Sequence, residues 1–202
     1  MTTKIDEKKD LIQESATMCF SKYGYSKTTL EDIAHSIGMK KSSLYYYFPN
    51  KETLFISTFS KEWQSKLLSI QRSVDNKFHG LERIREYTFQ SAAFFNTVVS
   101  GNKISVQLMI ETRRSFAEFF NEILKIEKRF YAKIFREAID NGEIKECDPQ
   151  KIAQIIITVS EAIKNDAFEA SEKIGGKKVD FIHLGREVEY TVNLILDGLR
   201  TR

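Results

Sequence analysis

Residues 40–54, KKSSLYYYFPNKETL, concentrate hydrogen-bond donors on a short stretch of chain. Lysine ammonium groups and the hydroxyls of serine and tyrosine all donate to phosphate oxygens. Between Lys22 and Lys51 there are five lysines against two acids, a local net charge of +3. The whole chain also carries a formal net charge of +3, so its other residues sum to zero. This pattern predicts a surface that faces the phosphate backbone of a nucleic acid.

The first element expected to support this surface is a helix over residues 5–23. Apolar residues recur there at intervals of three and four, which gives one apolar helix face. Gly24 follows at the position of a C-cap glycine, because glycine adopts the left-handed conformation without a Cβ penalty. The first helix is therefore predicted to end before Gly24.

Two shorter helices should follow and carry the donors. Thr28 precedes Glu31 by three residues and Thr29 precedes Asp32 by three, which is the spacing of a capping box at a helix start. A second helix should therefore begin there, and after a glycine a third should cover residues 40–47. Two short helices joined through a glycine form a helix-turn-helix.

The packing of this motif can be tested position by position. Ala34 is small where the second helix crosses the first, and Gly38 turns the chain. Three apolar side chains should fill the space between the helices: Ile33, Ile37 and Leu44. An ordinary helical hairpin without a DNA function is the alternative. The basic, hydroxyl-rich third helix favours DNA binding.

The composition favours a folded, all-α protein. Of the 202 residues, 42% are hydrophobic and 29% are charged, which disfavours disorder. Two prolines and nine glycines leave few positions that forbid helix, and no stretch shows the alternation of a sheet.

The sequence offers little for a disulfide, a metal or a membrane. Cys19 and Cys147 are too few and too far apart for a disulfide framework, and no zinc-type spacing of His or Cys occurs. The first residues lack the apolar core of a signal peptide, and no run reaches the roughly 18 apolar residues of a membrane span. We expect a cytoplasmic protein with no cofactor, no metal and no membrane partner.

Residues 28–54, TTLEDIAHSIGMKKSSLYYYFPNKETL, resemble the DNA-binding signature of the TetR family of bacterial transcription regulators. The resemblance covers residues 8–57 strongly and the remainder only in architecture. It implies an N-terminal three-helix DNA-binding domain over residues 1–50. A larger helical effector-binding and dimerisation domain over 51–202 should follow, with a helix over 51–74 linking the two.

The resemblance also implies which residues meet double-stranded DNA. Residues 40–47 would be the recognition helix in the major groove, with Lys41 and Ser42 at base edges. Thr28, Thr29 and Lys51 would clamp the backbone. For Tyr47, a place in the core stays open as an alternative. The predicted DNA-binding residues are Thr28, Thr29, Lys40, Lys41, Ser42, Ser43, Tyr45, Tyr46, Tyr47 and Lys51.

Three positions depart from the family pattern. Ser42 stands where glycine is frequent, Tyr47 replaces a histidine, and Lys40 replaces a small residue. No arginine occurs before Arg72, so guanine contacts would come from lysine, which lacks the fixed fork of arginine. We expect strong salt dependence and a modest direct base code.

After residue 78 the pattern predicts helices near 80–99, 103–112, 115–141, 149–173 and 181–200, with glycine-containing breaks between them. Asp148 should cap the helix at 149, with Pro149 in its first turn. Two apolar stripes near the end of the chain either close a monomeric core or, as the family implies, form a homodimer interface. The predicted interface residues are Ile152, Ile156, Val159, Ile163, Leu184, Val188, Ile195 and Leu199.

Eleven of the fifteen phenylalanines lie after residue 75, so an apolar effector pocket, as the family implies, competes with an ordinary aromatic core. The candidates for contact with an apolar or aromatic small molecule are Phe89, Phe120, Tyr131, Phe135 and Phe168. The working hypothesis is a dimeric repressor that a small-molecule effector releases from a near-palindromic operator.

Two other classes of function remain as alternatives. An enzyme would need a catalytic constellation, yet His35, His79 and His183 are scattered and no phosphate-binding glycine loop or nucleophile elbow occurs, so no catalytic residue is predicted. A helical interaction module could use the C-terminal stripes to bind a different protein. Such an adaptor need not form a homodimer.

Overall fold

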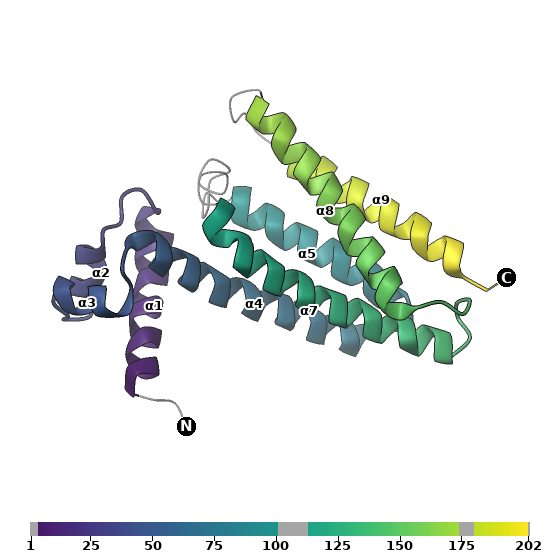
Figure 1. The fold of residues 1–202 in the computed structure, drawn as a ribbon, viewed down its shortest axis with the longest axis horizontal. Coiled ribbons are helices and arrows are strands. Elements are labelled where there is room, and N and C mark those ends of the chain that lie inside the picture. The colour runs from purple at the N-terminus through teal and green to yellow at the C-terminus, as the bar shows by residue number, and fades with distance from the viewer. Residues whose placement is uncertain (1–3, 101–112, 174–179, 202) are drawn as a thin grey trace. The chain divides into compact units, whose positions relative to one another are not determined.

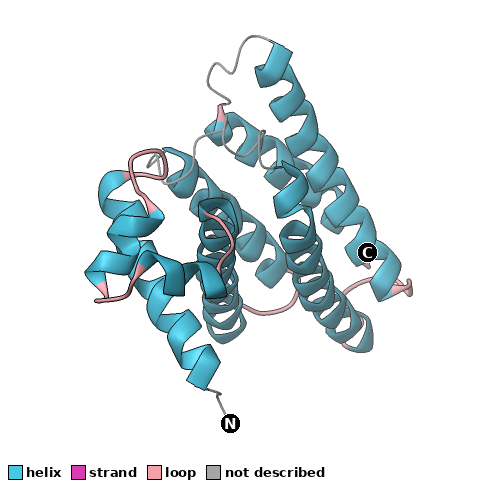
Figure 2. Cartoon of the chain, turned by 60° about the vertical axis from the view of Figure 1, so that its left-hand side comes forward, coloured by secondary structure: helices cyan, strands magenta, loops and turns pink. Residues whose placement is uncertain are grey.

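The computed structural model describes residues 4–100, 113–173 and 180–201 (Figure 1). Over these residues the chain is helical, with loops between the helices (Figure 2). The one extended pairing within these ranges is an isolated bridge between Ile144 and Arg200. The prediction of an all-α protein is therefore confirmed. The helix predicted over 103–112 lies outside the described residues.

The described residues form two compact units. The first contains residues 4–66, 98–100 and 113–119, and the second contains 67–97, 120–173 and 180–201.

The first unit begins with α1 (Lys4–Tyr23), α2 (Leu30–Ser36) and α3 (Lys41–Tyr47). Gly24 ends α1 with φ +80°, and its amide donates to the carbonyl of Phe20 at 2.9 Å. This is the C-cap conformation that the sequence predicts.

Thr29 is the N-cap of α2, and its capping box with Asp32 is complete. The second predicted box, from Thr28 to Glu31, is wrong. The hydroxyl of Thr28 instead donates to the carbonyls of Cys19 and Gly24, at 3.2 and 2.8 Å. Thr28 therefore stabilises the α1–α2 loop from inside, one residue before the N-cap of α2.

The predicted packing of α2 against α3 is confirmed. Ile33, Ala34 and Leu44 are buried. Gly38 adopts φ +65° between the two helices, and Ile37 is half-buried beside it.

Asn50 starts α4 (Lys51–Lys77), because its side-chain oxygen accepts from the amide of Thr53 at 2.7 Å. The helix runs three residues past its predicted end at Val74. In the first unit, α4 contributes to an aromatic core in which the rings of Phe59 and Phe116 meet edge to face, 5.5 Å apart. The buried aromatic residues of this core are Phe20, Phe55, Phe59, Trp63, Phe116 and Phe119.

Within the described residues, four further helices follow α4: α5 (Glu82–Ser100), α7 (Arg113–Asp140), α8 (Pro149–Lys173) and α9 (Phe181–Leu199). Their ends lie within two residues of the predicted ends. The cap predicted for α8 is also confirmed, because Asp148 accepts from the amides of Gln150 and Lys151.

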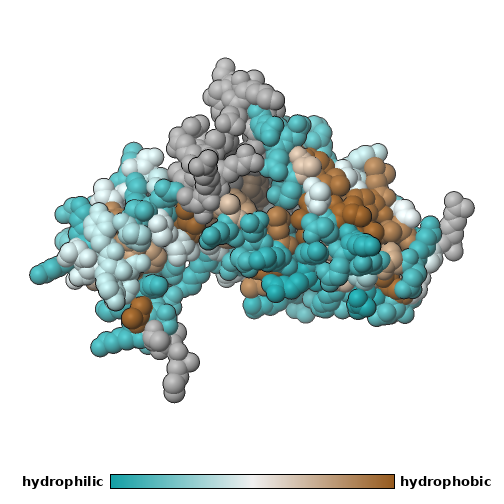
Figure 3. All heavy atoms as spheres, in the orientation of Figure 1, coloured by the Kyte–Doolittle hydropathy of each residue, from teal (hydrophilic) through white to brown (hydrophobic). Residues whose placement is uncertain are grey.

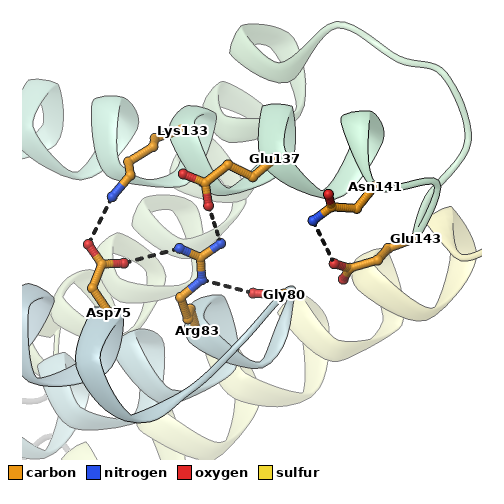
Figure 4. Close-up of polar contacts among 7 residues, drawn as sticks. All are labelled: Asp75, Gly80, Arg83, Lys133, Glu137, Asn141 and Glu143. Carbon is orange, nitrogen blue, oxygen red and sulfur yellow. Dashed lines mark hydrogen bonds and ion pairs between the residues drawn. The ribbon is translucent and has the colours of Figure 1, made fainter.

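Arg83 joins three helices of the second unit (Figure 4). Its guanidinium pairs with Asp75 on α4 and Glu137 on α7, and its Nε donates to the carbonyl of Gly80. Lys133 adds a second cation to Asp75 at 3.0 Å. The arginine side chain is only 11% exposed, so this network fixes the α4–α5 turn against α7.

Candidate nucleic-acid interface

The first turn of α3 is exposed to solvent. Lys40, Lys41, Ser42 and Ser43 are all exposed, whereas Leu44 is fully buried. Leu44 therefore anchors α3 in the core, and the start of the helix presents two lysine and two serine side chains to solvent. This is the arrangement that donor contacts to DNA require.

The three tyrosines of α3 differ in exposure. Tyr46 is 76% exposed and Tyr45 is 46% exposed. Tyr47 is half-buried, and its ring meets that of Tyr46 edge to face at 5.1 Å. Tyr45 and Tyr46 therefore have surface available for DNA, and Tyr47 supports the ring of Tyr46.

Thr29 is exposed at the start of α2. Its hydroxyl lies 2.7 Å from Asp32 Oδ2, and its amide donates to the same oxygen at 2.9 Å. The hydroxyl and then the amide of Thr29 hold the pKa of Asp32 below its ordinary value. Thr28, by contrast, is 1% exposed, so its hydroxyl does not reach the surface.

Lys51 is half-buried at the start of α4. Its ammonium donates to the carbonyls of Tyr25 and Thr28, at 3.0 and 3.1 Å, and lies 4.3 Å from the centre of the Tyr25 ring. Two of its three donors are thus used to hold the α1–α2 loop, which leaves one for a phosphate. Lys51 is 26 and 23 residues from these partners, so short-range spacing could not predict the contact.

Glu31 is a residue at this surface that sequence reasoning missed as a partner of the recognition helix. Its carboxylate lies 3.3 Å from the ammonium of Lys41, across the α2–α3 turn. The Glu31 side chain is 72% exposed and that of Lys41 is 49% exposed. The predicted base-reading lysine is therefore already paired with an acid in the DNA-free chain.

The predicted effector residues do not share one environment. Tyr131 and Phe135 are buried, Phe120 is half-buried, and Phe89 is 54% exposed. The side chain of Phe168 lies outside the described residues.

Polar groups lie beside the buried members of this set. The hydroxyl of Tyr131 lies 3.1 Å from that of Thr88, and Tyr87 donates to Glu127 at 3.1 Å. Burial raises the pKa of the Glu127 carboxyl above its ordinary value, and the positive charge of Lys164 opposes this shift. An apolar core with hydrogen-bonding groups therefore lies where the sequence suggested only aromatic rings.

The eight predicted dimer-interface residues fall into two groups. Ile156, Leu184 and Val188 are buried inside the chain, because α8 and α9 pack against each other. These three are core residues in the structure. The other five are half-buried: Ile152, Val159, Ile163, Ile195 and Leu199. Four other apolar residues of α8 and α9 are exposed: Ile155, Ile182, Tyr190 and Leu194.

None of the helices in the described ranges has the length and hydropathy needed to span a lipid bilayer. Within the same residues, no group of three or more His, Cys, Asp or Glu side chains is arranged to hold a metal ion.

Comparison with known proteins agrees with this geometry. The sequence model described as "Bacterial regulatory proteins, tetR family" matches residues 12–58, which span the second part of α1, α2, α3 and the start of α4. The icaADBC biofilm operon negative transcriptional regulator IcaR of Staphylococcus epidermidis is 49% identical over 145 residues, covering 72% of this chain and 72% of that protein. The chain belongs to the TetR family. It is accordingly a helix-turn-helix transcriptional regulator.

Solved structures of the TetR family and related regulators share the fold. A transcriptional regulator from Cytophaga hutchinsonii has a TM-score of 0.77 at 25% identity, covering 97% of this chain and all of that one. The complex of SmeT with triclosan has a TM-score of 0.59 at 17% identity, covering 96% of this chain and 92% of that one. SmeT is the repressor of the multidrug efflux pump SmeDEF in Stenotrophomonas maltophilia. At that identity the likeness to SmeT concerns the fold.

Proposed function

We propose that this TetR-family regulator is a homodimeric repressor that leaves a near-palindromic operator when a small, largely apolar effector binds. The observation that carries the proposal is the exposure of the whole first turn of α3 above a buried Leu44. A helix anchored on one side and covered with donors on the other fits the major groove.

The proposed DNA contacts follow the exposed donors. Lys41 and Ser42 face base edges, while Lys40, Ser43 and Thr29 bind phosphates. Tyr45 and Tyr46 add hydroxyl contacts, and Lys51 contributes its remaining donor. Thr28 is left out because its hydroxyl is buried. In this proposal the DNA-binding domain ends at residue 50, before α4.

The proposed dimer uses the exposed apolar face of α8 and α9. Figure 3 shows hydrophobic residues in brown along these helices. Ile155 on α8 is exposed, as are Ile182, Tyr190 and Leu194 on α9. Exposed apolar residues gathered on two adjacent helices favour a protein interface. A second copy of the chain would place two α3 helices for two half-sites, which explains the expected near-palindrome.

The direction of regulation and the effector rest on the relatives. IcaR is a negative regulator and SmeT is a repressor, so repression is the favoured mode for this chain. SmeT forms a complex with triclosan, a small organic molecule. In this chain the proposed effector site would be built around the buried Tyr131 and Phe135, close to Tyr87, whose hydroxyl donates to Glu127. To shift the chain almost completely from its DNA-bound state to its released state, an effector must bind the released state more tightly by about 5 kcal/mol.

An electrophoretic mobility shift with the gene's own upstream region tests the proposal. The wild-type chain should shift this duplex at moderate salt in the presence of excess competitor DNA. The double variant Lys40→Ala/Lys41→Ala should shift it only at a much higher concentration, since two phosphate- or base-seeking charges are lost. The absence of any specific shift by the wild-type chain would contradict the proposal.

A further inference from the structure

We propose that Glu31 is a specificity-determining residue, which pairs with Lys41 so that this lysine favours the operator over other DNA. The inference rests on the proposed DNA-binding function and concerns how the same surface discriminates between sequences. It starts from the 3.3 Å ion pair between Glu31 Oε2 and Lys41 Nζ.

The backbone on both sides of this pair is fixed. Glu31 lies in the first turn of α2, whose start is held by the Thr29–Asp32 capping box. Lys41 is the first residue of α3, which Leu44 anchors to the core. The separation of the two Cα atoms is therefore set by buried packing, and only the side chains are free to move.

The pair acts first on non-specific binding. Non-specific affinity comes almost entirely from cations that neutralise phosphates, and each one steepens the salt dependence. The carboxylate of Glu31 neutralises the positive charge of Lys41, so the ion pair as a whole adds nothing to the attraction between the protein and the DNA phosphates. Glu31 thereby lowers the affinity for DNA of any sequence.

The pair acts second on the geometry of Lys41. A lysine side chain has four flexible carbons and a point charge, so it selects a base only weakly when it moves freely. Glu31 confines the ammonium to one side of α3 before DNA arrives. Both side chains are substantially exposed, and exposed ion pairs are weak. The two acceptors of a guanine can therefore replace the carboxylate as partners of the ammonium, or bind the ammonium together with it. Confinement thus favours base contact at little cost to operator binding.

This role matters more here than in a domain with arginine. The chain has no arginine before Arg72, so Lys41 has no forked neighbour to supply a rigid base contact. The other exposed lysine of the turn, Lys40, makes no ion pair with a described residue and stays available to phosphates. The two adjacent lysines therefore have different roles: Lys40 contributes affinity for any DNA, and Lys41 selects between base sequences.

Fluorescence anisotropy with two duplexes tests the inference: one from the gene's own upstream region and a scrambled duplex of equal length and composition. Glu31→Gln keeps the shape and removes the charge. Glu7→Gln is the matched control, because Glu7 also lies exposed in the first turn of a helix, α1, and pairs with no described residue. Lys41→Gln and the double variant Glu31→Gln/Lys41→Gln complete a cycle.

Glu31→Gln should bind the scrambled duplex about two- to fivefold more tightly, while its affinity for the upstream duplex changes less. The ratio of the affinity for the upstream duplex to that for the scrambled duplex should therefore fall. For Glu31→Gln, the slope of log affinity against log salt on the scrambled duplex should steepen by about 0.9. Glu7→Gln should leave the ratio unchanged, and Glu31→Gln should have no further effect on the ratio in the Lys41→Gln background.

Equal effects of Glu31→Gln and Glu7→Gln on the ratio would overturn the inference while leaving the proposed function intact. A fall in the ratio that persists in the Lys41→Gln background would overturn it too. A wild-type chain with equal affinity for both duplexes would overturn both the inference and the proposed function.

Discussion

The ammonium of Lys51 lies 3.0 Å from the carbonyl oxygen of Tyr25, so the first residue of α4 holds the loop between α1 and α2. The same ammonium donates to Thr28, the residue before the N-cap of α2. The resemblance to the family implies a backbone clamp at Lys51, and the structure adds an internal role. A single lysine therefore couples the stability of the helix-turn-helix to its proposed contact with DNA.

Lys51→Met should destabilise the protein as well as weaken DNA binding. It removes two hydrogen bonds from a charged donor, each of a kind that contributes about 1.5–3 kcal/mol, and the partial exposure of Lys51 places the total loss at roughly 2 kcal/mol. Urea denaturation measures the loss. Lys40→Met is the control: it should weaken DNA binding with a stability change below about 0.5 kcal/mol. Equal stability of the two variants would contradict the internal role.

Thr29→Ala should lower stability most at neutral pH. The pKa of Asp32 is depressed in the folded chain by the Thr29 hydroxyl, so this carboxylate contributes stability above its unfolded pKa and loses it as pH falls through the folded value. The difference in melting temperature between wild type and variant should therefore shrink below pH 4 or so. A difference that stays constant down to pH 2 would show that Asp32 is not coupled to Thr29.

Arg83→Met should destabilise the second unit. The change leaves Asp75 and Glu137 without the guanidinium that pairs with both, and the arginine side chain is largely buried. Since the two carboxylates keep some contact with water, we expect a loss of roughly 2 kcal/mol, below the range for fully buried pairs. Lys125→Met removes an exposed ion pair and should cost less than about 0.5 kcal/mol. Chemical denaturation of both variants measures the loss in the free energy of unfolding. Similar losses for the two variants would contradict a special role of Arg83.

Leu194→Asp should disrupt the proposed dimer. Leu194 is 57% exposed on α9, and a carboxylate there would be buried without a partner in a dimer interface. Sedimentation equilibrium should show twice the chain mass for the wild type and a shift toward the single mass for the variant. Leu68→Asp changes an exposed leucine of α4 and should leave the mass unchanged. A wild-type chain that sediments as a monomer would contradict the proposed dimer.

Glu127→Gln should stabilise the protein at neutral pH. Burial raises the folded pKa of Glu127 above its reference value of 4.5, so ionisation costs stability as pH rises above that value. Glutamine keeps an acceptor for the Tyr87 hydroxyl without the charge. The variant should melt at a higher temperature than the wild type at pH 7, with the gain vanishing near pH 4. Glu118→Gln, an exposed change on α7, should show no such pH dependence.

The sequence was sufficient for features that depend on neighbours along the chain. Helix ends followed from Gly24, Asp148 and Pro149, because caps and turns act within a few residues. The exposed turn of α3 followed from the same kind of local pattern, with Leu44 as its buried anchor.

Features set by tertiary packing could not be predicted in this way. Thr28 and Thr29 have the same spacing to an acid, and only the fold shows that Thr28 points toward Cys19 and Thr29 caps the helix. An apolar stripe does not reveal its neighbour, so a homodimer interface and a monomeric core both remained open for Ile156 and Leu184, and both residues are buried within the chain.

Selection of duplexes from a random pool tests the central claim most directly, because it assumes no operator. The wild-type chain should enrich one near-palindromic site at moderate salt, with half-sites separated by about one helical turn or a multiple of it. The Lys40→Ala/Lys41→Ala variant, which removes two exposed cations from α3, should enrich none. A wild-type pool that stays random after repeated rounds would contradict the account.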